Sequence, residues 1–165
     1  MKSFKGKLIK LTVERKRLPN GHVVRLEIVR HPGAALIIPF LNRNKIILIK
    51  QFRPVINSYL YELPAGTLGA NETPLECARR EIVEEIGYTA GKLSKIGSIY
   101  PVPGYSTEVI TIFKAEKLTK KMKHAEPDEI ISIILFHKSQ IHRLFKSGKI
   151  KDAKTISALA LCNWL

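Results

Sequence analysis

The sequence predicts a mixed α/β fold, an α+β sandwich, from three observations. Short apolar or alternating stretches typical of β-strands lie on both sides of one amphipathic segment, residues 74–86. Further helical patterns occupy the C-terminal end of the sequence. The 165 residues are enough for one proper core. We therefore expect residues 1–165 to form a single domain of packed strand and helix layers.

The first half of the chain is strand-like. Residues 7–16 and 22–30 alternate between apolar and polar side chains around the turn Pro19-Asn20-Gly21, which predicts an N-terminal antiparallel β segment over about residues 1–30. The apolar runs at residues 34–40 and 45–52 are joined by a turn at residues 41–44. Their continuous hydrophobicity predicts a buried hairpin.

The central helix has clear boundaries in the sequence. Thr73 is suited to the N-cap, Pro74 to the first helical position, and Glu76 completes a T-x-x-E capping box. Gly87 is suited to end the helix in a left-handed conformation. Four apolar side chains recur at helical spacing and define the core face: Leu75, Ala78, Ile82 and Ile86.

The remaining elements follow from the same patterns. Residues 95–101, 107–118 and 129–138 read as strands. A helix is expected from about Ser139 to Lys146, ended near Gly148, and a last one from about Asp152 to the end of the sequence.

The charge is strongly positive, and the acids are unevenly distributed. The chain has 28 Lys and Arg against 14 Asp and Glu, a net charge of +14, which attracts anions in general. The densest basic stretch, residues 114–124, lacks interleaved aromatic side chains, so a solvated loop is favoured over an RNA-binding patch, which stays open. Six acids nevertheless fall within 24 residues: Glu62, Glu72, Glu76, Glu81, Glu84 and Glu85.

The composition also bears on location. Cys77 and Cys162 cannot form a disulfide framework and are expected to be buried free thiols, as in a reducing cytosol. We see no secretory signal pattern at the N-terminus, and the longest apolar run, residues 34–41, is too short to cross a bilayer. A cytoplasmic protein without membrane association is expected.

The carboxylates of the central helix need an explanation beyond helix stability. Glu81, Glu84 and Glu85 crowd one side of the helix, and like charges at these spacings cost roughly 0.2–0.5 kcal/mol per pair. The helix dipole also disfavours anions near its C-terminal end. A divalent cation such as Mg²⁺ or Mn²⁺ would stabilise the cluster. The alternative is a solvated acidic face paired with Arg79 and Arg80.

The spacing of these residues resembles the Nudix box of the Nudix hydrolase superfamily. The matching positions are Gly66, Glu72, Arg80, Glu81, Glu84, Glu85 and Gly87. The resemblance implies an α/β/α Nudix sandwich with a mixed sheet. It also implies hydrolysis of a nucleoside diphosphate linked to another moiety, with Mg²⁺ or Mn²⁺.

The resemblance also implies roles for residues of the box. Glu81, Glu84, Glu85 and the carbonyl of Ala65 would be metal ligands. Arg80 would orient a carboxylate, Gly66 would let the loop turn, and Glu72 would hold the loop or join the metal set.

Three further motifs resemble the ADP-ribose pyrophosphatase branch: "QFRP" at 51–54, "YELPAG" at 61–66 and "PVPGYSTEVI" at 101–110. The implied reaction converts ADP-ribose and water to AMP and ribose 5-phosphate. Hydrolysis of GDP-mannose or another nucleotide sugar, and action on RNA ends, remain alternatives. Arg53, Glu62, Pro103 and Gly104 are the implied substrate-binding residues. From the residues alone, Arg53 fits a surface ion pair equally well.

A general base and a dimer are expected on the same grounds. The branch takes its base from an acidic loop between late strands, which here leaves Glu126, Asp128 and Glu129 as candidates. Pro127 favours an extended or turning backbone in that loop, and an ordinary charged loop is the alternative. Enzymes of the branch are typically homodimers whose N-terminal strands help to bind the partner's substrate.

Overall fold

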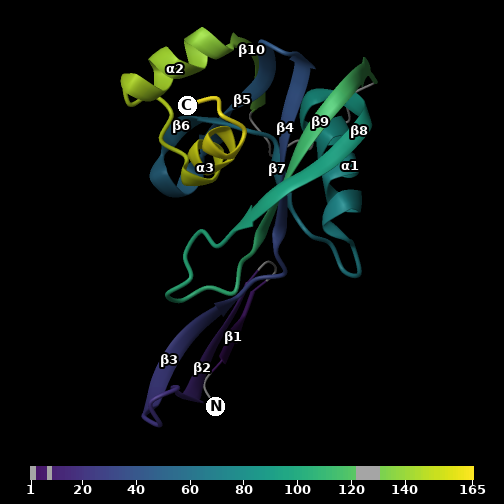
Figure 1. The fold of residues 1–165 in the computed structure, drawn as a ribbon. Helices are drawn as coiled ribbons and strands as arrows, with labels where there is room; N and C mark the ends of the chain where they lie inside the picture. The colour runs from purple at the N-terminus through teal and green to yellow at the C-terminus, as the bar shows by residue number, and fades with distance from the viewer. Residues whose placement is uncertain (1–2, 7–8, 122–130) are drawn as a thin grey trace.

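The fold is that of a computed structural model, which describes residues 3–6, 9–121 and 131–165 (Figure 1). Within these residues the chain forms a seven-stranded sheet, a separate three-stranded sheet and three α-helices. None of the described helices is both long enough and apolar enough to cross a membrane.

The large sheet has the order β10-β5-β4-β9-β8, and its central pair, β4 and β9, is parallel while its other pairs are antiparallel. Two short strands extend it, because β6 pairs with β5 and β7 with β4. The strand bounds are β4 Ala34–Asn42, β5 Lys45–Arg53, β6 Ser58–Glu62, β7 Ala65–Thr67, β8 Tyr88–Ile99, β9 Ile110–Lys120 and β10 Ile131–His137.

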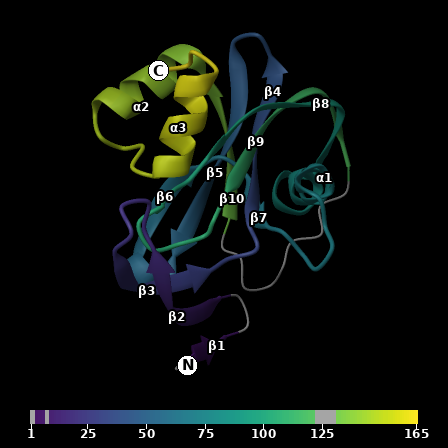
Figure 2. The same cartoon turned by 60° about the horizontal axis from the view of Figure 1, so that its bottom comes forward.

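Helices cover both faces of this sheet. Helix α1 (Pro74–Ile86) lies on one face, and α2 (Lys138–Lys146) and α3 (Ala153–Leu161) lie on the other (Figures 1 and 2). Strand β4 alternates between the two cores: Leu36 and Ile38 belong to the cluster on the α3 side, whereas Ile37 belongs to the cluster on the α1 side. The expected α/β/α sandwich with a mixed sheet is therefore confirmed.

Helix α1 begins and ends where its sequence predicts. Thr73 Oγ1 accepts a hydrogen bond from Glu76 N at 3.3 Å, and Thr73 N donates to Glu76 Oε2 at 2.8 Å, which completes the capping box. Gly87 closes the helix with φ of 69°. These local signals determine where the helix that carries the carboxylates begins and ends.

Some strands differ from the prediction. Strands β6 and β7 were not expected, because both are short: β6 pairs with the preceding strand β5 across a short turn, whereas β7 pairs with β4, which is distant in sequence. Strand β8 begins at Tyr88 rather than near Lys95, since its first half pairs with the end of β9 despite containing Gly91. Helix α3 ends at Leu161, before the last residue. Strand β7 and the first half of β8 thus depend on pairing with strands distant in sequence, which local propensity does not contain.

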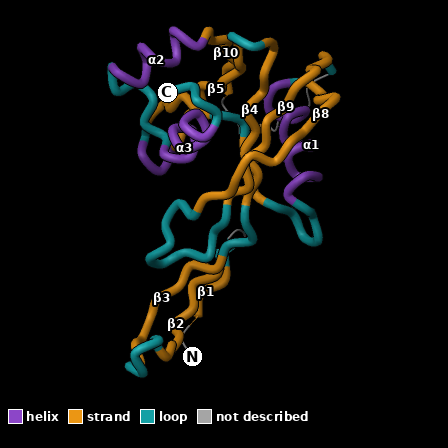
Figure 3. The backbone as a smooth tube through the Cα atoms, in the orientation of Figure 1, coloured by secondary structure: helices purple, strands orange, loops and turns teal. Residues whose placement is uncertain are grey.

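The N-terminal β segment forms its own sheet, from β1 (Ser3–Lys5), β2 (Lys10–Arg17) and β3 (Val23–Arg30). It projects from the sandwich as an arm (Figures 1 and 3). The arm is joined to the loop before β9: Val29 N donates to Tyr105 O at 2.8 Å, and Thr107 N donates to Val29 O at 3.0 Å. The predicted N-terminal antiparallel segment is thus confirmed, with β1 as an addition.

Candidate active site

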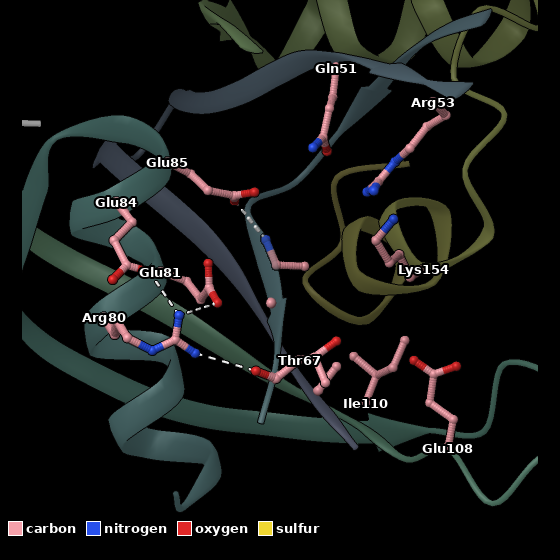
Figure 4. Close-up of a pocket in the computed structure, with 13 residues that line it drawn as sticks. Gln51, Arg53, Thr67, Arg80, Glu81, Glu84, Glu85, Glu108, Ile110 and Lys154 are labelled. Carbon is pink, nitrogen blue, oxygen red and sulfur yellow. Dashed lines mark hydrogen bonds and ion pairs between the residues drawn. The ribbon is translucent and has the colours of Figure 1, made fainter. Parts of the chain in front are cut away.

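A polar cavity of about 490 Å³ lies between helix α1, strands β5 and β7, and the start of helix α3. Figure 4 shows two groups of charged side chains in it. Glu81, Glu84 and Glu85 line it from α1, whereas Arg53 and Lys154 line it from β5 and α3. The cavity therefore has an acidic wall and a basic wall.

The acidic wall is not a solvated helix face. Glu81 is 8% exposed and Glu85 only 2%. Arg80 Nη1 donates to Glu81 Oε1 at 2.6 Å and to Glu84 Oε2 at 2.8 Å. The alternative of an exposed acidic face is therefore wrong for Glu81 and Glu85, although the expected pairing with Arg80 is present.

Arg80 also holds the loop that precedes the helix. Its Nε donates to Glu72 Oε1 at 2.8 Å, and its Nη2 donates to Glu72 Oε2 at 3.0 Å. The hydrogen bond from Arg80, with a second from the Gly69 backbone, lowers the pKa of Glu72 from 4.5 to about 2. Arg80 thus binds the carboxylates of Glu72, Glu81 and Glu84, and Glu72 joins the loop to the helix through Arg80 and the Gly69 backbone.

The backbone of strand β7 packs closely against the carboxylates of Glu81 and Glu85. A Cβ added at Gly66 would lie 1.6 Å from Glu81 Oε1, so only glycine leaves room for that side chain. Ala65 N donates to Glu85 Oε2 at 2.9 Å. Ala65 and the three helix carboxylates predicted as metal ligands therefore line the same cavity.

The chemistry of this wall suits a hard divalent cation. Its donors are carboxylate and carbonyl oxygens, the ligands that Mg²⁺ and Mn²⁺ take, and no cysteine or histidine is among the described residues that line the cavity. Among the described residues, no three His, Cys, Asp or Glu side chains already converge as a metal site. The Glu81 and Glu84 carboxylates are instead bridged by Arg80.

The basic wall is built around one buried acid. Glu62 is 1% exposed and accepts hydrogen bonds from Arg53 Nε and Nη2, each at 2.7 Å, and from Lys154 Nζ. Burial raises the pKa of Glu62, but Arg53 and Lys154 outweigh it and lower the pKa. Glu62 itself does not line the cavity. Its geometry is that of a positioning residue for two cations rather than of a direct substrate or metal contact.

Helix α3 supplies the second cation of this wall. Asp152 caps the helix by accepting from Thr155 N at 3.0 Å, and its other oxygen accepts from Lys154 Nζ at 2.9 Å. Lys154 was not among the predicted site residues. The signal was the lysine next to a helix start, which becomes meaningful only once β6 brings Glu62 beside it.

Two other lining residues were also missed as site residues. Gln51 is 7% exposed, and no described group donates to its Oε1. Glu108 falls within residues 107–118, which the sequence predicts as a strand, but it precedes β9 and lines the cavity, with its Oε1 3.9 Å from His31 Nδ1. Both positions depend on how strands assemble.

The remaining predicted residues lie elsewhere. Pro103 and Gly104 are exposed in the loop before β9 and do not line this cavity. Glu126, Asp128 and Glu129 lie outside the described residues. Of the two free thiols, Cys77 is buried as expected, whereas Cys162 is only partly buried.

Comparisons with known proteins identify the family. A family profile described as the NUDIX domain matches residues 30–159. An ADP-ribose pyrophosphatase of Bacillus subtilis is 39% identical over 94% of this chain and 85% of its own length. A methanol dehydrogenase activator of Bacillus methanolicus is 36% identical over the same shares, and a GDP-mannose pyrophosphatase of Shigella flexneri is 32% identical over 81% and 78%.

A solved structure described as an ADP compounds hydrolase superposes with a TM-score of 0.81 over 97% of this chain and 87% of that chain, at 22% identity. That likeness shows the shared fold. The profile match covers the sheet, α1 and both walls of the cavity. The chain therefore belongs to the NUDIX domain family.

Proposed function

We propose that this protein is a metal-dependent pyrophosphatase that hydrolyses nucleoside diphosphate sugars, with ADP-ribose and water giving AMP and ribose 5-phosphate. The observation that carries the proposal is the pair of opposed walls, carboxylates on α1 facing Arg53 and Lys154. A diphosphate suits both walls, because its charge can be neutralised by a cation held on the carboxylates and by Arg53 and Lys154. The ADP-ribose pyrophosphatase at 39% identity supports ADP-ribose as the substrate.

Mg²⁺ or Mn²⁺ is the proposed cofactor, held by Glu81, Glu84, Glu85 and the carbonyl of Ala65. When bound, such a cation neutralises charge on the diphosphate and lowers the pKa of water. Arg80 keeps Glu81 and Glu84 on the cavity side of α1 in the meantime. The donor set carries the negative charge that this role requires.

The basic wall holds the substrate in this proposal. The guanidinium of Arg53 remains partly exposed while Glu62 fixes its orientation, and Lys154 provides a second positive charge beside it. Both can donate to phosphate oxygens, where the planar guanidinium adds geometric selection. Positioning of this kind lowers the entropy that the reacting groups must lose.

The remaining assignments are proposals from resemblance. One of Glu126, Asp128 and Glu129 would be the general base that takes a proton from water. Pro103 and Gly104 would contact the substrate from the loop that is hydrogen-bonded to the arm. In the proposed homodimer, the arm of one subunit would help to bind the substrate of its partner. A cytoplasmic location is proposed as well.

GDP-mannose is the second candidate substrate, since the relative from Shigella flexneri bears that name at 32% identity. ADP-ribose and GDP-mannose share the diphosphate that the two charged walls would bind, and they differ in the base and the sugar. The net charge of +14 keeps RNA ends as a third possibility.

Product analysis tests the proposal. ADP-ribose, GDP-mannose, diadenosine polyphosphate, NADH and 5′-triphosphorylated RNA are incubated with the protein and Mg²⁺, and in parallel with EDTA. We expect metal-dependent release of AMP and ribose 5-phosphate, fastest from ADP-ribose. Release that persists in EDTA, or cleavage confined to RNA ends, contradicts the proposal. Glu85→Gln should fold normally and lose most turnover.

A further inference from the structure

A second cavity, of about 590 Å³, lies at the opposite ends of the elements that form the active site. Strand β4 enters the active site at Ala34 and reaches this cavity at Phe40. Helix α3 likewise has Lys154 at the active site and Leu161 at the second cavity. The two cavities share no lining residue among those described, so the second one is not used by the proposed reaction.

The interior of the second cavity is apolar and aromatic. Phe40 and Trp164 line it, with ring centroids 5.4 Å apart in an edge-to-face arrangement. Ile96 of β8 and Leu161 of α3 add aliphatic surface, and Leu161 is 50% exposed. An exposed apolar side chain beside a buried aromatic pair offers a surface that an apolar ligand can cover.

The rim of the cavity is positively charged. Arg43, Lys114 and Lys117 lie on it, against one acid, Glu116. Lys114 Nζ lies 2.7 Å from Glu116 Oε1 and 4.9 Å from the centroid of the Phe40 ring. The local charge therefore favours an anion, held next to apolar surface.

Lys117 has an unusual backbone that the sheet accommodates. Its φ is 56°, in the left-handed region that a residue with a side chain rarely adopts inside a strand. Gly91 of β8 lies against it, and a Cβ added there would lie 3.0 Å from Lys117 Cβ. Strain of this kind persists where the surrounding structure enforces it, and it is enriched at ligand sites.

We propose that this second cavity binds a small amphiphilic organic anion. Its acidic group pairs with Arg43, Lys114 and Lys117, and its apolar body covers Leu161 and the edge of the Phe40–Trp164 pair. The site is separate from the diphosphate site and does not depend on the function proposed for it.

Trp164 provides a direct test, because it is the only tryptophan of the chain. Its fluorescence reports on this cavity and not on the arm or the active site. Octanoate is titrated against the wild-type protein, with octylammonium as a probe of equal length and opposite charge. We expect a saturable change in Trp164 emission with octanoate and none with octylammonium. An equal response to both, or no saturable response to octanoate up to ~10 mM, overturns the proposal.

Variants separate charge from folding. Lys117→Glu should raise the Kd for octanoate by about tenfold, a shift of one decade in the titration midpoint. Lys117→Gly should also weaken binding while folding at least as well as wild type, because glycine adopts positive φ without strain. Lys95→Glu makes the same charge change on exposed β8 outside the cavity and should leave Kd within about twofold. If Lys95→Glu weakens binding as much as Lys117→Glu, the signal reflects net charge and the proposal fails.

Discussion

At the scale of single residues, the site combines groups that are costly to bury. Glu81, Glu85 and Glu62 are each less than 10% exposed, and buried carboxylates require partners. Arg80 meets this need on α1, and Arg53 with Lys154 meets it around Glu62. Because each cation forms an ion pair with a carboxylate that the fold holds in place, the charges of both walls are oriented before a substrate binds.

Gly66→Ala tests how closely loop and helix are fitted. The added Cβ would lie 1.6 Å from Glu81 Oε1, so the carboxylate must move. We expect turnover to fall by about 10²-fold, the effect of a displacement near 1 Å at a reacting site. Far-ultraviolet circular dichroism should show an intact fold.

Gly69→Ala is the matched control from the same loop. Its Cβ would lie 3.4 Å from Glu72 Oε2, an ordinary contact, so activity should stay near wild type. Equal activity in both variants would contradict the assignment of Glu81 to the reaction.

Gln51→Leu tests the buried amide oxygen to which no described group donates a hydrogen bond. Leucine has a similar size and removes the polar atoms, so stability should be unchanged or slightly higher. If Gln51 Oε1 accepts a hydrogen bond from substrate or water, kcat/KM should fall about tenfold. Thermal unfolding and steady-state kinetics are measured together. Lower stability with unchanged kcat/KM would assign Gln51 a structural role instead.

At the scale of elements, the position of α1 depends on its connection to the preceding loop. Its capping box and Gly87 define its length locally, but the contacts of Arg80 with Glu72 and with Thr67 O fix the loop against it. Helix α3 is fixed in a similar way, since Leu63 N donates to Thr155 Oγ1 at 2.9 Å. Both helices therefore place their charges through contacts outside themselves.

The Glu72–Arg80 pair predicts a pH dependence of stability. The pKa of Glu72 is about 2 in the folded protein, below the ordinary 4.5. A lowered pKa stabilises the fold above pH 4.5, and this contribution is lost as the pH falls from 4.5 towards 2. In Glu72→Gln, the melting temperature should fall less steeply across that window than in wild type. Identical slopes for Glu72→Gln and wild type would refute the assignment.

At the scale of the whole molecule, the arm exposes apolar side chains that the single chain does not cover. Phe4 and Leu11 are cross-strand partners, as are Leu11 and Val29, so these side chains share one face, and Val23 lies on the same face of β3. Phe4 is 62% exposed, Leu11 37% and Val23 54%. The same face also carries the charged side chains of Arg15, Arg25 and Glu27, and exposed apolar side chains among polar ones on a projecting sheet are typical of an interface.

The homodimer proposed above predicts the mass in solution. Light scattering with size-exclusion chromatography should give twice the chain mass of 18.6 kDa. Leu11→Lys with Val23→Lys should give a monomer, because charges would lie on the interface. Lys10→Glu, on the other face of the arm, should remain dimeric. A monomeric wild-type protein would contradict the proposal.

The sequence by itself determined the layers, the ends of α1 and the acidic wall. These depend on local rules: a capping box, helical and strand periodicity, and the spacing of Gly66, Glu72 and the helix carboxylates. Only the tertiary structure decided the place of Lys154 beside Arg53 in the basic wall, the cavity positions of Gln51 and Glu108, and the contacts of Glu62 with both cations. These residues come from β5, β6, the loop before β9, and α3, so up to 103 positions separate them in the sequence. Their contacts form through strand pairing and helix docking, which no local pattern records.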